Sequence, residues 1–364
     1  MKRKAQRVFI SDCEGPISKN DNAFELAAHF IPKGEKLFAV ISRYDDVLAE
    51  IVKPPGYKAG DTLKLILPFF KAFDVTDGEM LAFSRQNLLL MPYAKQTLAY
   101  IRGFMPTYIV STSYEHYIKA LCETMEFPFQ NAYCTRLALD KYDITPKEKQ
   151  KLREIAQEIA GMPMIEIPGN AKSLSDLHPT HRTTIERLNE IFWKEIAQMR
   201  IGEIFSEVNP VGGGEKARAV EEIAQNHGVE LENVMYVGDS ITDVESFRLV
   251  RSRGGLTISF NGNRYAVREA EIAVLSQNTA VTSILAKVFH EHGRDQVLRL
   301  TKNWNMETLS KLDVPTRIIE HALRAHPEGL PKIKIVTREN MEAVARESSE
   351  FRKKVRGEAV GALG

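Results

Sequence analysis

The chain has 364 residues, 43% of them hydrophobic and 27% charged, which predicts a soluble globular protein of roughly two domains or one domain with large insertions. Lysine and arginine total 49 against 48 acidic residues, and this balance gives no reason to expect nucleic acid or an anionic membrane as a partner. The sequence holds no apolar run of about 18 residues, which excludes a membrane-spanning helix.

The cysteines and the start of the chain bear on the cellular compartment. The three cysteines, Cys13, Cys122 and Cys134, lie far apart and form no CxxC motif, which argues for a reducing compartment and against a structural zinc site. The apolar stretch 8–10, behind the basic segment 2–7, is too short for the core of a signal peptide. We therefore expect a cytoplasmic protein.

The chain begins with a predicted strand and a long helical stretch. Residues 8–11 form a short apolar strand that stops at the polar turn Asp12-Cys13-Glu14-Gly15-Pro16. About eighty mostly helical residues follow. The capping-box pattern predicts helix starts at Asn22 with Glu25 and at Thr76 with Glu79. The breaks between these helices are expected at Gly34, Pro54-Pro55-Gly56 and Gly78.

Next comes a region in which strands and helices alternate. The expected elements are a helix over 92–102, a strand over 106–110 that ends in Ser111-Thr112-Ser113, a helix over 114–125 and an extended segment over 131–139. From Thr145-Pro146-Lys147-Glu148, which combines a cap, a first-turn proline and a box glutamate, the pattern is again helical, with a second helix over 181–199.

The remaining elements complete the alternation. A loop over 208–214 precedes a helix over 215–227, and a strand over 234–237 leads directly into Gly238-Asp239-Ser240. Short strands are expected over 256–260 and 272–275, and residues from about 280 to the end are predicted to be helical. Alternating strands and helices predict an α/β fold with a doubly wound parallel sheet.

Three polar clusters fall at the carboxyl ends of predicted strands, at Asp12, Ser111 and Asp239. Ligands of parallel sheets bind at that edge, so the coincidence indicates a site. Taken singly, the clusters at Asp12 and Ser111 have the alternative interpretation of a turn or a helix cap. The segment 238–243, Gly-Asp-Ser-Ile-Thr-Asp, adds two carboxylates four residues apart, and oxygen ligands of this kind suit Mg²⁺.

The order of these elements resembles the haloacid dehalogenase-like (HAD) superfamily of phosphohydrolases. The motifs are Asp12-Cys13-Glu14-Gly15-Pro16, then Ser111 after a strand, then Lys216 opening a helix, then the segment 238–243. The resemblance implies a HAD-like Rossmannoid core with helical cap insertions and a helical C-terminal tail. It implies the following division: residues 1–18, 91–140 and 207–280 form the core, 19–90 a helical cap, 141–206 a second, mostly helical insertion, and 281–364 the helical C-terminal extension.

The resemblance also implies a role for each site residue. Asp12 would attack phosphorus and form an aspartyl-phosphate, and Glu14 would be the general acid and base. Ser111 and Thr112 would hold phosphoryl oxygens at a helix start, and Lys216 would neutralise the nucleophile and the transferring group. Mg²⁺ would be bound by Asp12, the Glu14 carbonyl and Asp239, with Asp243 holding a metal-bound water or orienting Lys216.

Glu14 departs from the aspartate that most phosphatases of the superfamily carry at this position. Its extra methylene changes where the proton is delivered, and an error of about 1 Å can cost about 100-fold in rate. We expect a phosphatase acting on a small phosphorylated metabolite, with no nucleic acid or membrane partner. The alternatives are a phosphotransferase and a weakly catalytic relative that binds a phosphate ligand or a partner.

Overall fold

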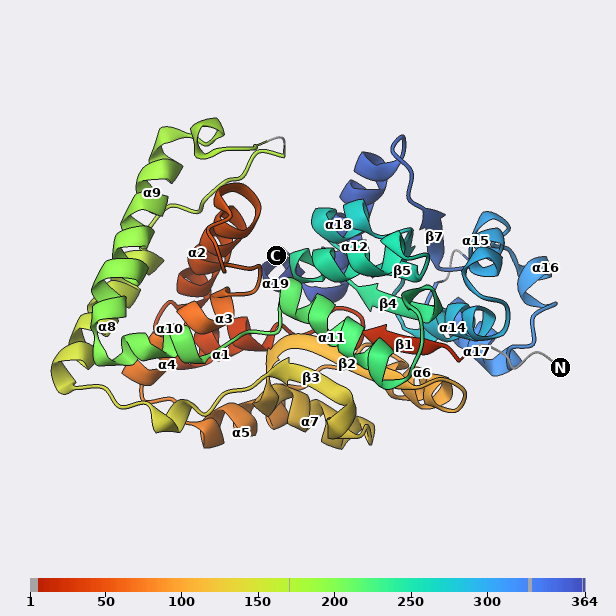
Figure 1. The fold of residues 1–364 in the computed structure, drawn as a ribbon, viewed down its shortest axis with the longest axis horizontal. Coiled ribbons are helices and arrows are strands. Elements are labelled where there is room, and N and C mark those ends of the chain that lie inside the picture. Colours follow the sequence, from red (N-terminus) through yellow and green to blue (C-terminus); the bar gives the residue numbers. More distant parts are fainter. Residues whose placement is uncertain (1–5, 170, 327–328, 362, 364) are drawn as a thin grey trace.

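The computed structural model describes residues 6–169, 171–326, 329–361 and 363. Within these residues the chain folds into an α/β structure with one sheet of seven strands in the order β3-β2-β1-β4-β5-β6-β7 (Figure 1). The strands are β1 (Val8–Ser11), β2 (Thr107–Tyr114), β3 (Ala132–Thr135), β4 (Val234–Gly238), β5 (Leu256–Phe260), β6 (Ile272–Leu275) and β7 (Lys332–Ile335). All neighbouring strands are parallel except β6 and β7.

Strand β1 lies at the centre of the sheet because it pairs with β2 on one side and with β4 on the other. The strand order reverses direction here, and in open α/β sheets a ligand binds outside the carboxyl ends of the strands at such a switch point. Strands β1, β4, β5 and β6 are buried along their whole length, which explains why β1, β4 and β6 are nearly continuous apolar runs.

Helices cover both faces of the sheet, which is the doubly wound arrangement that the sequence predicts. Val8 and Ile10 point to one face and Phe9 to the other. The first face packs against α11 (Gly214–Asn226), α12 (Val244–Ser252) and α13 (Arg264–Glu269). The second packs against α6 (Ala94–Arg102), α7 (Glu115–Met125), α14 (Ala280–His292), α15 (Arg294–Lys302) and α17 (Thr316–Arg324).

The two insertions share one hydrophobic core, on the left of Figure 1. The first insertion contributes α1 (Asn22–Phe30), α2 (Gly34–Val47), α3 (Thr62–Leu65), α4 (Leu67–Ala72) and α5 (Asp77–Asn87), and the second contributes α8 (Pro146–Ala160), α9 (Pro179–Glu190) and α10 (Ile204–Glu207). Leu37 of α2 and Phe69 of α4 lie in the same cluster as Leu152 and Ile155 of α8. The second insertion is therefore packed against the first.

The C-terminal region is only partly helical. The sequence predicted helix from residue 280 to the end, but β7 extends the sheet antiparallel to β6. Residues 332–335 read Lys-Ile-Lys-Ile, and such an alternation is the pattern of a strand with one covered face. After β7 come α18 (Met341–Arg356) and α19 (Glu358–Gly361), while the short α16 (Met306–Leu309) precedes α17. Val344 and Ala345 of α18 pack against Val267 of α13, so α18 lies on the core.

Several element boundaries differ from the prediction. Strand β2 runs to Tyr114, four residues further than expected, and its register with β3 shifts between Val110 and Tyr114. The cap of α1 is Asp21, whose carboxylate accepts from the Phe24 amide, and not Asn22. The capping boxes at Thr76 and at Thr145 are confirmed.

Two further points concern turns and membranes. Gly78 lies inside α5 and breaks no helix. Among the described residues, no helix has the length and apolar character needed to cross a membrane.

Candidate active site

Asp12 directly follows β1, at the switch point of the sheet. Its side chain is almost fully buried, and its Oδ1 accepts from the Cys13 amide at 2.6 Å. Its Oδ2 lies 2.8 Å from the Lys216 ammonium. Burial raises the pKa of Asp12 to about 8, with Lys216 opposing the shift and Asp243 and Asp239 adding to it. Asp12 thus lies in an acidic environment that favours a further cation.

Lys216 lies in the first turn of α11 and has no solvent-exposed surface. Its ammonium contacts Asp12 and Asp243, each at 2.8 Å. Burial by itself would lower the pKa of Lys216, but the two carboxylates raise it above its usual value. Lys216 is therefore a fixed positive charge beside Asp12.

Asp243 is fully engaged by neighbouring donors. Its Oδ1 accepts from Lys216 at 2.8 Å and from the Tyr236 hydroxyl at 2.7 Å. Its Oδ2 accepts from the amides of Asp239 at 2.9 Å and Ser240 at 3.0 Å. A carboxylate offers about four lone-pair sites, and four donors occupy them. The geometry favours Asp243 as the residue that orients Lys216 and the turn after β4, over a direct metal ligand.

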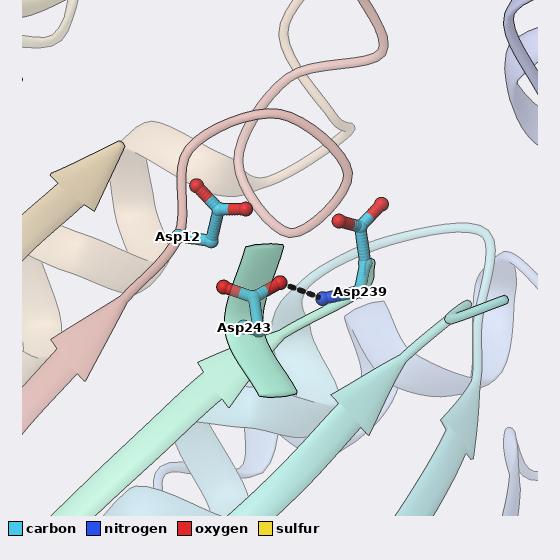
Figure 2. Close-up of side chains that lie close together, drawn as sticks. All are labelled: Asp12, Asp239 and Asp243. Atoms are coloured by element: carbon cyan, nitrogen blue, oxygen red, sulfur yellow. Dashed lines mark hydrogen bonds between the residues drawn. The ribbon is translucent and has the colours of Figure 1, made fainter. Parts of the chain in front are cut away.

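The residues present fit a magnesium ion. Asp12, Asp239 and Asp243 each offer a carboxylate oxygen, and these oxygens lie within 4.8 Å of one another (Figure 2). All three side chains are buried, and three carboxylates in a buried volume repel one another unless cations are near. Oxygen ligands from one or two carboxylates are the set that Mg²⁺ uses in proteins. With Asp243 engaged elsewhere, Asp12 and Asp239 are the two carboxylates best placed to bind it.

Glu14 lies in the loop that follows Asp12 and is partly buried. Its Oε1 accepts from the Asn22 amide at 2.7 Å, at the start of α1. Burial raises the pKa of Glu14 well above its usual value, with the nearby Asp21 carboxylate adding to the shift. A raised pKa favours the protonated form of the carboxyl group, which is the form that a general acid requires.

Gly15 brings this loop against Asp239. Its φ of +102° is one that glycine tolerates best, and a Cβ there would lie 2.0 Å from Asp239 Oδ2. Only a residue without a side chain allows so close an approach. The turn after β1 and the turn after β4 are thereby held together, which keeps Asp12 and Asp239 at one site.

Ser111 and Thr112 line the same cavity as Asp12, but they lie within β2 and not at a helix start. Helix α7 begins only at Glu115, because the strand continues past the register shift. Ser111 Oγ accepts from the Ser113 amide at 3.2 Å. The buried Thr112 Oγ1 has no hydrogen-bond partner among the described residues. A buried hydroxyl without a partner is a donor that a bound anion could satisfy.

The insertion helices close the cavity. It measures about 90 Å³ and is lined from the insertion side by residues that include Asp45, Asp46 and Thr62. Gly60 has a φ of +93°, and a Cβ there would lie 2.8 Å from the Thr112 side chain and 3.1 Å from that of Thr242. Asp45 Oδ2 holds this loop by accepting from the Gly60 amide at 2.9 Å and the Thr62 hydroxyl at 3.0 Å. The loop at Gly60 thus lies directly on the turns that carry the polar clusters.

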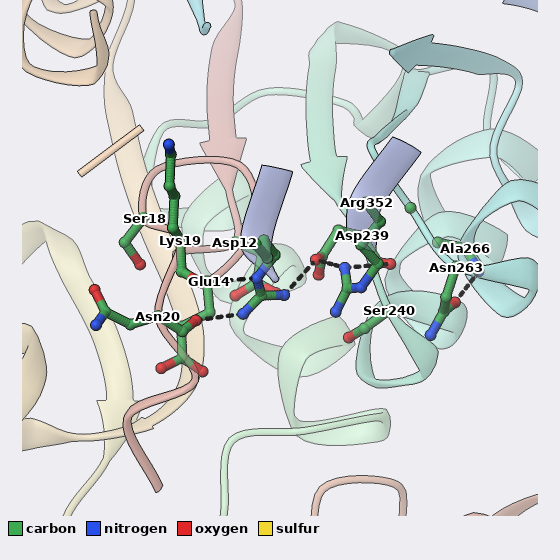
Figure 3. A network of polar contacts seen from close by, with 12 residues as sticks. Asp12, Glu14, Ser18, Lys19, Asn20, Asp239, Ser240, Asn263, Ala266 and Arg352 are labelled. Atoms are coloured by element: carbon green, nitrogen blue, oxygen red, sulfur yellow. Dashed lines mark hydrogen bonds and ion pairs between the residues drawn. The ribbon is translucent and has the colours of Figure 1, made fainter. Parts of the chain in front are cut away.

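The sequence prediction missed two arginines of this site. Arg352 and Arg356, both in α18, form ion pairs with Asp239 Oδ2, the second at 3.2 Å, and both line the cavity. Figure 3 shows Arg352 beside Asp239. The signal available in the sequence was the spacing of four along α18, where Val344, Ser348 and Arg352 are buried. A charged helix near the C-terminus is normally predicted to lie on the solvent-exposed surface, and no local motif distinguishes its arginines.

The chain is similar to several known proteins. A family model of haloacid dehalogenase-like hydrolases matches residues 108–286. This matched segment, just under half of the chain, resembles the haloacid dehalogenase-like hydrolases. The chain shares its fold with the structure of gene product AF1437 from Archaeoglobus fulgidus, at 24% identity and a TM-score of 0.78, with 99% of each chain covered.

Two further likenesses are to phosphoserine phosphatases. A curated phosphoserine phosphatase of Archaeoglobus fulgidus is 40% identical over 68 residues, which is 19% of this chain and 19% of that protein. The match thus spans about a fifth of the relative's length. A structure described as the phospho-aspartyl intermediate analogue of phosphoserine phosphatase has a TM-score of 0.46 and 14% identity, and covers 78% of this chain and 98% of its own.

Proposed function

We propose that this HAD-like protein is a Mg²⁺-dependent phosphatase that hydrolyses a small phosphorylated molecule through an aspartyl-phosphate on Asp12. The observation that carries the proposal is the buried Asp12–Lys216–Asp243 arrangement beside Asp239, at the switch point of the sheet. An ion arrangement of this kind is costly to bury. Its position at the carboxyl ends of β1 and β4 supports a catalytic use.

In the first step, an Asp12 carboxylate oxygen attacks phosphorus and the bond from phosphorus to the leaving oxygen breaks. Asp12, Asp239 and the Glu14 carbonyl would hold Mg²⁺, which when bound would supply positive charge beside the transferring group. Lys216 lies 2.8 Å from Asp12 and neutralises charge at the same place, while its bond to Asp243 keeps the ammonium oriented. The Ser111 and Thr112 hydroxyls are positioned to donate to phosphoryl oxygens.

Glu14 performs the proton transfers in this proposal. Its protonated carboxyl group gives a proton to the leaving alkoxide, and the resulting carboxylate then takes a proton from the water that cleaves the aspartyl-phosphate. Hydrolysis releases inorganic phosphate and restores Asp12. The raised pKa of Glu14 supports the first role, and its bond to the Asn22 amide fixes the side chain at the entrance to α1.

The helical unit formed by the two insertions is proposed as the cap that selects the substrate. With the loop at Gly60 against the core, the cavity of about 90 Å³ is far smaller than a typical ligand pocket of about 300 Å³ or more, so the substrate is small or the cap opens to admit it. The named relative makes phosphoserine the first substrate to test. Cys13, Cys122 and Cys134 are free and buried, which supports a cytoplasmic location.

The test is release of inorganic phosphate from a panel of phosphorylated metabolites, headed by phosphoserine, with Mg²⁺ and with a chelator. We expect hydrolysis of at least one small phosphomonoester that requires Mg²⁺ and is lost in Asp12→Asn. Trapping of a beryllofluoride adduct on Asp12 would support the covalent step directly. Absence of hydrolysis across the panel, in a protein that still binds phosphate, would overturn the proposal in favour of a phosphate-binding relative.

A further inference from the structure

Two arginines from the far end of the chain reach the carboxylate of Asp239. The side chains of Arg352 and Arg356 are 4% and 3% exposed, and both make ion pairs with Asp239 Oδ2. Arg352 also donates to the Asp239 carbonyl at 3.4 Å. One turn earlier in α18, the Ser348 hydroxyl donates to the Gly262 carbonyl at 2.7 Å. Helix α18 is therefore fixed against the core with its arginines inside the cavity.

The two arginines are held differently. Arg356 Nε donates to the Lys19 carbonyl at 3.0 Å, and its Nη2 donates to the Asn20 carbonyl. Among the described residues, Arg352 contacts no carbonyl of the loop at Lys19 and Asn20, and its one carbonyl contact is the long one to Asp239 at 3.4 Å. Its buried Nε lacks a hydrogen-bond partner among the same residues. Burying a guanidinium donor without a hydrogen-bond partner lowers the stability of the folded protein, and such a donor can bind an anion. Of the pair, Arg352 is the group with unused hydrogen-bonding capacity in the cavity.

Three cations lie against the three carboxylates at the carboxyl ends of β1 and β4. The carboxylates of Asp12, Asp239 and Asp243 face three cations, namely Lys216, Arg352 and Arg356. Two further acidic residues of the cavity wall have donors of their own, since Asp46 pairs with Arg43 and Asp45 accepts from Tyr57, Gly60 and Thr62. Glu14 and Asp21 also line the cavity, and each accepts from a backbone amide. A divalent cation adds two positive charges, which match the two negative charges of a phosphoryl group.

We propose that Arg352 is a phosphoryl-binding residue of the active site, supplied by the C-terminal helix. In this proposal Arg352 neutralises Asp239 while no cation is bound there. Once Mg²⁺ takes over that role, the guanidinium is available to phosphoryl oxygens in the same cavity, where Arg binds with two parallel donors. Arg356 stays on the Lys19 and Asn20 carbonyls and holds α18 in place. The inference rests on the proposed function for its ligand, and adds a cation that the superfamily motifs do not contain.

The test uses the full-length protein and inorganic phosphate, so it needs no turnover. Calorimetry in saturating Mg²⁺ compares the wild type with Arg352→Gln and with the matched control Arg346→Gln, which removes the same charge from an exposed position of α18. We expect Arg352→Gln to weaken phosphate binding about 10- to 100-fold and Arg346→Gln to leave it unchanged. Without phosphate, Arg352→Gln should bind Mg²⁺ more tightly than the wild type, because a competing cation is gone.

Equal phosphate affinity in Arg352→Gln and Arg346→Gln would overturn the proposal, as would weaker Mg²⁺ binding in Arg352→Gln. Should Arg352→Gln fail to fold, Arg352→Lys keeps the charge but loses the planar fork. Its phosphate affinity should then fall below that of the wild type, and unchanged affinity would count against the proposal. If the wild type binds phosphate through Arg352 but hydrolyses no phosphomonoester, the proposed function is wrong while the phosphoryl-binding role of Arg352 stands.

Discussion

The two walls of the active site differ in how visible they are in the sequence. The wall formed by the carboxyl ends of β1 and β4 carries Asp12 and Asp239, each directly after a buried apolar strand. The wall formed by α18 carries Arg352 and Arg356 on a helix that follows the last strand of the sheet. The first wall follows from local sequence and sheet topology, while the second depends on where a distant helix packs. Predictions that separate the two walls are therefore the most informative.

The largest effect is expected on the first wall. Asp12→Asn should lower kcat by about 10⁴-fold or more, because an amide cannot act as the nucleophile while its shape preserves the surroundings. Steady-state phosphate release measures this, and thermal unfolding checks that the fold is intact. Activity within tenfold of the wild type would remove the covalent mechanism.

Glu14→Gln should lower kcat by about 10²- to 10⁴-fold while phosphate still binds, because the amide can neither give nor take the proton. Glu14→Asp is the sharper variant. It keeps the acid but shortens the side chain that accepts from the Asn22 amide at 2.7 Å. If the extra methylene fits the site, Glu14→Asp loses activity, and if aspartate is the better acid here, activity is retained or rises. A kcat for Glu14→Gln equal to that of the wild type would exclude an acid–base role.

Much of the first wall could be predicted because its signals are local. Asp12, Ser111 and Asp239 follow apolar runs, Lys216 opens a helix, and parallel strands bring their carboxyl ends to one edge. The helix-start role expected of Ser111 was wrong because β2 continues through the register shift to Tyr114. That shift depends on pairing with β3, which no local pattern reveals.

The second wall and the insertions depend on long-range packing. Nothing near Arg352 in the sequence indicates that it meets Asp239, 113 residues away. Likewise, Leu37 and Leu152 lie in one hydrophobic core, although the sequence around each predicts only its own helix and not the packing between the two helices. Strand β7 is different, because its alternation of Lys and Ile is a local strand pattern, although the prediction of a helical tail includes these residues.

A smaller effect is expected from the anchor of the second wall. Arg356→Gln removes the donors to the Lys19 and Asn20 carbonyls and one ion pair of Asp239. The free energy of unfolding should fall by about 2–3 kcal/mol, because buried carbonyls lose charged donors. Urea denaturation measures it. Lys354→Gln, at an exposed position of the same helix, is the control and should change stability by less than about 0.5 kcal/mol. Equal stabilities in the two variants would mean that Arg356 does not hold α18 to the core.

The smallest effect tests a single hydroxyl of the first wall. Thr112→Val replaces the buried Oγ1, which has no partner among the described residues, by a methyl group of similar size. One neutral hydrogen bond contributes about 0.5–1.5 kcal/mol, so phosphate affinity in Mg²⁺ should fall by only about 3- to 10-fold. Stability should stay equal or rise, because the folded protein no longer buries an unsatisfied hydroxyl.

Ser113→Ala is the matched control for Thr112→Val. Ser113 Oγ is also buried without a partner among the described residues, but Ser113 is not part of the cavity lining, whereas Thr112 is. Both variants remove an unsatisfied hydroxyl, so both should be at least as stable as the wild type. Only Thr112→Val should weaken phosphate binding in calorimetry. If both variants weaken it equally, the loss comes from a general change in β2, and the phosphate does not contact the Thr112 hydroxyl.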